Sequence, residues 1–168
     1  MTGNEFLKAG NYIKILILLL LIFFLPTELI AIKEPVSSPD FKLQDTRQDI
    51  ITLSSYKDEQ PVVLFFWATW CPFCQKELSV LNNMYAGLVE EGIEVLAINV
   101  GELSDEVSNF IKSYNLAYRV LLDKDTTVAR TFQAEVPTYI LIDKKGQVVF
   151  RDDYFPYEKY KELILEGK

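Results

Sequence analysis

The chain of 168 residues contains two cysteines, which lie close together in the motif Cys71-Pro72-Phe73-Cys74. The motif follows an apolar run at 62–68 and opens a segment with helical spacing, so Pro72 takes the first helical position and Cys71 the N-cap. A helix N-terminus stabilises a thiolate relative to a thiol, and the thiolate is the species that attacks a disulfide. Cys74 lies almost one turn later and points further into the protein. We therefore predict a redox-active disulfide in which Cys71 is the nucleophile and Cys74 the resolving thiol.

Two other interpretations of a Cys-x-x-Cys motif are half of a zinc site and a static disulfide. A four-ligand zinc site needs two more Cys or His ligands, and the chain has no histidine and no further cysteine. A static disulfide that closes so small a loop constrains the unfolded chain little. The missing histidine also excludes Cys–His nucleophiles and Ser–His–Asp triads. We expect no metal ion and no cofactor.

The composition is that of one globular domain, with 49% hydrophobic and 24% charged residues. The net charge is −7, and because residues 1–32 carry two basic and two acidic groups, the rest of the chain carries all of it. An acidic domain without a basic cluster repels nucleic acid, so we expect no nucleic-acid partner.

An apolar segment stands near the N-terminus. Ile15–Leu25 is an unbroken apolar run, and the wider stretch Tyr12–Ile32 approaches the ~20 residues of a membrane span. Lys8 and Lys14 precede it, which keeps the N-terminus cytoplasmic and places the remainder outside. An uncleaved anchor is favoured, with a cleaved signal peptide or a buried core helix as alternatives. The predicted organisation is an anchor or signal segment at 1–32, a linker at 33–40 and one domain at 41–168.

Apolar runs and helical spacing predict an α/β domain with a mixed sheet. Strands alternate with helices at first, and a hairpin and a helix finish the chain. Ser104 is expected to cap its helix. The expected strands are Phe41–Leu43, Ile50–Leu53, Val62–Ala68, Ile93–Val100, Arg119–Leu122, Tyr139–Ile142 and Gln147–Arg151, and the expected helices are Cys71–Glu90, Ser104–Tyr114, Thr126–Phe132 and Tyr157–Leu165.

Two segments resemble the thioredoxin superfamily. The first is Phe66–Cys74, with the sequence FWATWCPFC, and the second is Val136-Pro137-Thr138. The resemblance implies a thioredoxin fold in which Pro137 follows a cis peptide bond and its loop offers backbone groups to the bound substrate. Taken alone, Val-Pro-Thr could also be an ordinary proline at the start of a strand. The residues expected to contact substrate are Trp70, Pro72, Phe73, Val136 and Pro137, whereas Trp67 is expected in the core.

More narrowly, the chain resembles the membrane-tethered TlpA/ResA branch. The apolar N-terminus, the extra strand pair before Val62 and the helix-plus-strand unit at 104–122 carry this resemblance. Glu77 matches an acidic residue of ResA-like proteins that tunes the cysteine pair and helps to move protons. Glu77 lies on the helical face of Cys74 and, if part-buried, could take a proton from the resolving thiol. The alternative is a solvated glutamate favoured by the helix dipole. Phe65 stands where many cytoplasmic thioredoxins carry a buried aspartate.

The resemblance implies a disulfide reductase that acts on exported proteins. Apocytochrome c is a natural substrate class, and a membrane protein of the CcdA/DsbD type is the expected electron donor. Pro72-Phe73 differs from the dipeptides of thioredoxin and ResA, so an oxidase or isomerase remains an alternative. A copper chaperone with a thioredoxin fold is a minor alternative, because Sco-like chaperones use a wider cysteine spacing and a histidine.

Overall fold

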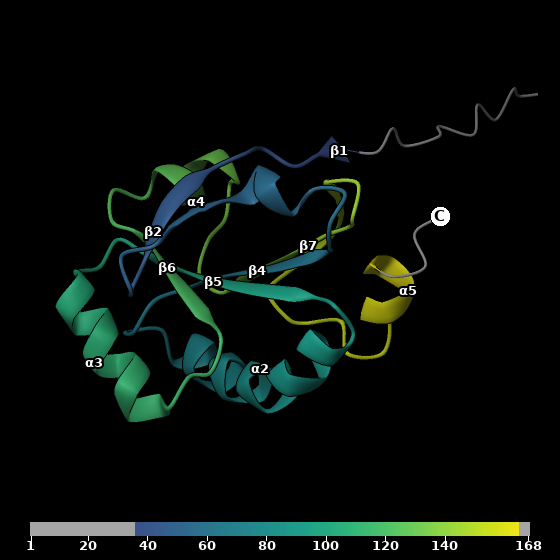
Figure 1. Ribbon diagram of the computed structural model, residues 1–168. Helices are drawn as coiled ribbons and strands as arrows, with labels where there is room; N and C mark the ends of the chain where they lie inside the picture. Colours follow the sequence, from purple (N-terminus) through teal and green to yellow (C-terminus); the bar gives the residue numbers. More distant parts are fainter. Residues whose placement is uncertain (1–35, 165–168) are drawn as a thin grey trace, which may run out of the picture. The chain divides into compact units, whose positions relative to one another are not determined.

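The structure, a computed structural model, describes residues 36–164 and contains eight strands and four α-helices in that range (Figure 1). One 3-10 helix, η1, covers Leu53–Tyr56. The strands are β1 Val36–Ser37, β2 Lys42–Asp45, β3 Ile50–Thr52, β4 Val62–Trp67, β5 Glu94–Val100, β6 Arg119–Asp123, β7 Thr138–Ile142 and β8 Gln147–Asp152. The helices are α2 Pro72–Glu90, α3 Ser104–Tyr114, α4 Thr127–Thr131 and α5 Tyr160–Ile164.

The strands form one mixed sheet in the order β1-β8-β7-β4-β5-β6-β2-β3. The central strands β4, β5 and β6 are parallel, and all other pairs are antiparallel. Because β4 and β5 are parallel neighbours, their carboxyl ends lie at the same edge of the sheet. The loops that follow Trp67 and Val100 therefore start side by side, and the first of them leads into the cysteine motif.

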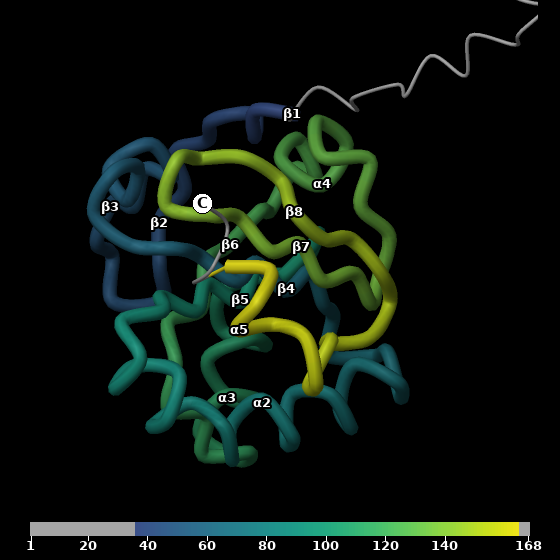
Figure 2. The backbone as a smooth tube through the Cα atoms, turned by 90° about the vertical axis from the view of Figure 1, so that its right-hand side faces the viewer, coloured from purple at the N-terminus to yellow at the C-terminus, as the bar shows by residue number. Residues whose placement is uncertain are grey.

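Side chains of β4 alternate between two cores, one on each face of the sheet. Val63, Phe65 and Trp67 belong to the core beneath α2, α3 and α5. Leu64 and Phe66 belong to the core that α4 and η1 cover. Figures 1 and 2 show α4 on one face and α2 and α3 on the other. A strand buried on both faces needs a continuous apolar sequence, and this is the pattern that predicted β4 and β5.

The predicted α/β class and mixed sheet are confirmed, and most predicted elements agree within one or two residues. The prediction that Ser104 caps its helix is wrong. The N-cap of α3 is Leu103, which is extended and makes no side-chain cap hydrogen bond. The last helix begins at Tyr160 instead of Tyr157, because Pro156 first starts a turn in which its carbonyl accepts from Lys159 and Tyr160.

No pattern in the sequence indicated β1, which falls inside the predicted linker 33–40. Val36 and Ser37 pair with Val148 and Gln147 of β8 and extend the sheet by one strand. The predicted anchor or signal segment at 1–32 lies outside the residues that the structure describes. Within 36–164, no helix is both long and apolar enough to cross a membrane.

Candidate active site

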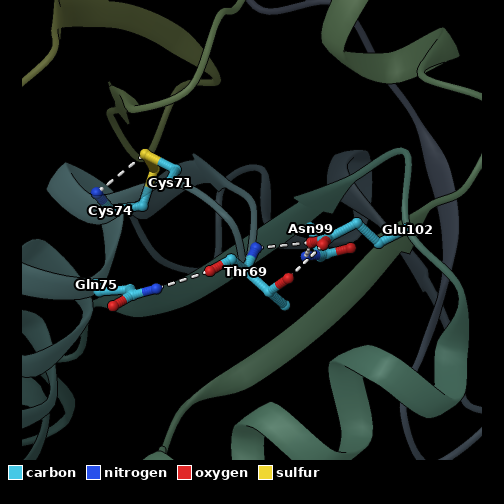
Figure 3. Close-up of a disulfide and its surroundings, with 6 residues drawn as sticks. All are labelled: Thr69, Cys71, Cys74, Gln75, Asn99 and Glu102. Carbon is cyan, nitrogen blue, oxygen red and sulfur yellow. Dashed lines mark hydrogen bonds between the residues drawn. A yellow bond between two sulfur atoms is a disulfide. The ribbon is translucent and has the colours of Figure 1, made fainter.

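Cys71 and Cys74 are joined by a disulfide at the start of α2. Cys71 is the N-cap residue, with Pro72 immediately after it, as the sequence predicted. The Sγ atom of Cys71 accepts a hydrogen bond from the backbone N–H of Cys74 at 3.1 Å (Figure 3). Cys71 is 4% exposed and Cys74 is fully buried. Cys71, whose sulfur accepts this bond at the start of the helix, is therefore also the more exposed residue of the pair.

Large side chains next to the disulfide lie on the surface. Trp70 is 68% exposed and Phe73 69% exposed, so two aromatic groups flank the redox pair on the solvent side. The Lys76 ammonium lies 5.8 Å from the centre of the Phe73 ring. Trp67, by contrast, is fully buried, as expected. The contact of these two rings with a substrate stays a prediction.

The Val136–Pro137 peptide bond is cis, which confirms that prediction. Pro137 directly precedes β7, whose first residue, Thr138, is paired with Phe66 near the end of β4. The proline loop therefore ends where β7 begins, next to the end of β4, where the loop to Cys71 starts. Val136 and Pro137 are both half-buried. Their role in binding a substrate strand stays a prediction.

Glu77 is half-buried on α2, one turn after Cys74. Within the described part of the chain its carboxylate accepts one hydrogen bond, a long one of 3.3 Å from the hydroxyl of Tyr157. Burial and the charge of Glu77 together raise the pKa of Tyr157 to about 12. The phenol of Tyr139, stacked on the ring of Phe65, is buried and has no hydrogen-bond partner in residues 36–164. Burial and, secondly, the charge of Glu77 raise the pKa of Tyr139 as well.

A second carboxylate, Glu102, holds the loop that leads to Cys71 (Figure 3). It follows β5 and accepts hydrogen bonds from the backbone N–H of Thr69 at 2.7 Å and from the Thr69 hydroxyl. The side-chain amide of Asn99, which is 1% exposed, donates to the same carboxylate at 2.6 Å. Glu102 thus accepts three hydrogen bonds at the shared edge of β4 and β5.

The opposite side of Thr69 is tied to α2. The side-chain amide of Gln75 donates to the carbonyl of Thr69 at 2.8 Å, and the hydroxyl of Tyr114 on α3 donates to Gln75 at 3.1 Å. We call Thr69, Gln75, Asn99 and Glu102 the loop clamp. Sequence reasoning missed it, although one signal was present: Asn99 is a lone amide in a strand whose other residues after Glu94 are all apolar.

No group of three or more His, Cys, Asp or Glu side chains between Val36 and Ile164 is arranged to hold a metal ion. The disulfide at the N-cap of α2 supports exchange of thiols and disulfides at Cys71 and Cys74.

Residues 36–151, which include the cysteine motif, Pro137 and the loop clamp, match the AhpC/TSA family. The chain belongs to the AhpC/TSA family. Among curated proteins, "Thiol-disulfide oxidoreductase ResA" of Bacillus subtilis is 40% identical over 120 residues, which are 71% of this chain and 66% of that protein. The protein of the same name from Geobacillus kaustophilus is 35% identical over 73% of this chain and 70% of its own length. The predicted resemblance to ResA is confirmed.

The chain spans just under two thirds of the Bacillus subtilis and Bacillus cereus relatives. Among solved structures, a "thiol:disulfide interchange protein, thioredoxin family protein" from Chlorobium tepidum superposes with a TM-score of 0.69 at 21% identity, over 82% of this chain and 99% of the other. A second Chlorobium tepidum structure is 26% identical, with a TM-score of 0.69 over 79% and 95% of the two chains. These similarities confirm the predicted thioredoxin fold.

Proposed function

We propose that the chain is an extracytoplasmic thiol–disulfide oxidoreductase that reduces disulfides of exported proteins. The observation that carries this proposal is the position of Cys71. Its sulfur sits at the N-cap of a helix of 19 residues and accepts the N–H of Cys74, and Cys71 is the less buried residue of the pair. This environment favours the thiolate of the reduced protein, and the curated relatives are named for the same chemistry.

The reaction proceeds in two exchanges. The thiolate of Cys71 attacks one sulfur of the substrate disulfide, forms a mixed disulfide and releases the other substrate sulfur as a thiolate, which takes up a proton. Cys74 then loses its proton and attacks the sulfur of Cys71, which releases the second substrate thiol and leaves the Cys71–Cys74 disulfide. Two electrons pass from the protein to the substrate. A dithiol donor must return them before the next cycle.

The resemblance to ResA supports a proposal for the protein substrates and for the electron donor. Exported proteins with cysteines are the substrates, with apocytochrome c as the first candidate, and a membrane protein of the CcdA/DsbD type is the donor. The exposed rings of Trp70 and Phe73 provide apolar contact area next to the reactive sulfur. Val136 and Pro137, at the neighbouring strand end, are the candidates for backbone contacts with the substrate.

The N-terminal segment supports a location outside the cytoplasm, with Lys8 and Lys14 ahead of the apolar stretch Tyr12–Ile32. Expression of the full chain followed by alkaline extraction of membranes tests this. An uncleaved anchor leaves a protein of full mass in the membrane pellet. A shorter protein in the soluble fraction would show a cleaved signal peptide instead, and full-length protein in the soluble fraction would contradict both.

Trapping with insulin as a disulfide probe tests the roles of the two cysteines. The Cys74→Ala variant should accumulate a mixed disulfide with insulin, because nothing resolves it, whereas Cys71→Ala should not. Equal trapping by the two variants would refute the assignment.

The direction of electron flow is tested by the reduction potential in glutathione buffers. A value near the −270 mV of thioredoxin, within about 30 mV, supports a reductase, and a value near about −120 mV, as in DsbA, would identify an oxidase.

A further inference from the structure

We propose that Glu102 is a positioning residue of the redox centre: through Thr69 it holds Cys71 at the N-terminus of α2 (Figure 3). The inference rests on the proposed thiol–disulfide exchange and adds to it a residue far from the Cys-x-x-Cys motif in sequence. Glu102 does not touch the sulfur atoms in the structure. It acts on the loop that carries them.

The hydrogen bonds of Glu102 hold its carboxylate in a fixed position. A carboxylate only accepts hydrogen bonds, and here two oxygens meet three donors: the N–H and the hydroxyl of Thr69 and the amide of Asn99. Asn99 is almost completely buried on β5, where it is the register partner of Trp67 on β4. The carboxylate is therefore anchored to the carboxyl ends of β4 and β5, and the bonds to Thr69 transmit that position to the loop.

Thr69 passes this position on toward Cys71. Its N–H is bound by Glu102 and its carbonyl by Gln75 of α2, so the two peptide groups that flank Thr69 are both fixed. One residue before it, the carbonyl of Ala68 accepts the N–H of Cys71 at 3.2 Å. The loop from the end of β4 to the N-cap is thus held at Thr69, by Glu102 on one side and by Gln75 of α2 on the other, and is closed by the bond between Ala68 and Cys71.

The reduced protein needs this clamp more than the oxidised one. In the oxidised state the disulfide itself keeps Cys71 next to Cys74. Reduction removes that covalent link, and the position of the Cys71 sulfur against the N–H of Cys74 then depends on the loop and on the first hydrogen bonds of α2. If the loop shifts, the Cys71 sulfur moves away from the N–H of Cys74. This shift weakens the stabilisation of the thiolate and misplaces the nucleophile, and misplacement by ~1 Å can cost about 10²-fold in rate.

Glu102 also carries a negative charge. The charge and the hydrogen bonds of Glu102 should act in opposite directions on the pH at which the Cys71 thiolate forms. A nearby anion disfavours a thiolate, so removal of the charge alone should lower the midpoint pH at which the Cys71 thiolate forms. Loss of the clamp should raise that midpoint toward the value of a free cysteine. Glu102→Ala removes both charge and hydrogen bonds. Glu102→Gln removes the charge, and its amide keeps the contacts if the Thr69 hydroxyl turns to accept, so this variant separates the two effects.

The experiment measures alkylation of the reduced full chain by iodoacetamide as a function of pH, together with the reduction potential. For Glu102→Ala we expect the midpoint of Cys71 to rise by about one pH unit, and the rate at neutral pH to fall about tenfold. Glu102→Gln should restore a rate within about twofold of the wild type. Glu106→Ala is the matched control: it removes the same charge from an exposed position on α3 and should change neither the midpoint pH nor the alkylation rate.

An unchanged midpoint in Glu102→Ala overturns the proposal, and so does a fall of the midpoint in both Glu102 variants, which would assign the effect to charge. If Glu102→Ala does not fold, Thr69→Val decides, because it removes one bond to the carboxylate and keeps the backbone N–H. A raised midpoint then supports the clamp and an unchanged one refutes it. Wild-type protein that reduces no insulin disulfide would refute the proposed function, while the alkylation profiles would still test Glu102.

Discussion

Two carboxylates lie near the Cys71–Cys74 disulfide, and the protein holds them in opposite ways. Glu102 accepts three hydrogen bonds, two of them at 2.6 and 2.7 Å, from groups fixed by the sheet and by the loop. Glu77 accepts one bond of 3.3 Å within residues 36–164, and its donor, Tyr157, is 41% exposed. A rearrangement of Glu102 would break three hydrogen bonds, whereas a rearrangement of Glu77 would break one long one.

The contrast separates positioning from proton transfer. A group that positions a loop must keep its hydrogen bonds throughout the reaction, and a group that takes up a proton must be free to change partners. Glu77 lies one turn after the buried Cys74, on the same helix, so it is the carboxylate suited to the proton of the resolving thiol. Glu102 sits at the other end of the loop and is suited to hold it. Three predictions test whether the two carboxylates differ in this way.

The largest expected effect concerns the second exchange. Glu77→Gln should slow the attack of Cys74 on the mixed disulfide by about 10²-fold at neutral pH, the lower end of general-base contributions, and should leave the attack of Cys71 nearly unchanged. Stopped-flow mixing of the reduced protein with an aromatic disulfide separates the two, because each exchange releases one coloured thiolate. Glu90→Gln is the control, since Glu90 is exposed at the far end of α2. Equal slowing of both phases, or of neither, would remove Glu77 from the proton step.

The next effect is on stability. Glu102→Ala leaves two N–H donors and a hydroxyl without their acceptor, and an unsatisfied buried donor costs about 1–3 kcal/mol. Because water can reach this half-exposed site, we expect about 1–3 kcal/mol in total. Glu77→Ala should cost less than about 0.5 kcal/mol, because this half-buried side chain makes only one long hydrogen bond within residues 36–164. Urea unfolding of the oxidised proteins measures both values, and equal losses would contradict the comparison.

The sequence predicted what depends on local pattern. β4 and β5 are recognisable because strands buried on both faces need continuous apolar runs. The N-cap position of Cys71 follows from Pro72, whose lack of an N–H suits the first turn of a helix. These two local signals are sufficient to place the redox pair at the start of its helix.

The loop clamp depends on contacts between distant segments, and no local pattern encodes those. Thr69 and Glu102 are residue types that usually lie in water, and only the parallel register of β4 and β5 brings them together. β1 was missed for the same reason: two residues become a strand because β8 offers a free edge, not because of their own pattern. At α3, the hydroxyl of Ser104 suggested a cap, but the chain enters the helix through extended Leu103.

The smallest expected effect tests the contact between Glu77 and Tyr157 directly. Burial and the charge of Glu77 raise the pKa of Tyr157 to about 12, above the ordinary value of about 10. Glu77→Gln removes the charge but not the burial, so the pKa of Tyr157 should fall part of the way back. Ultraviolet titration of tyrosinate measures it, and Tyr157→Phe assigns the signal.

The same shift sets a pH window for stability. Because the pKa of Tyr157 is higher in the folded than in the unfolded protein, its contribution is complete below pH about 10 and is lost as the pH rises toward about 12. Glu77→Gln should therefore lose less stability across that window than the wild type does. An identical alkaline decline, with an unchanged Tyr157 pKa, would mean that Glu77 does not rest against Tyr157 in solution. The comparison between Glu77 and Glu102 would then lose the one hydrogen bond on which the description of Glu77 depends.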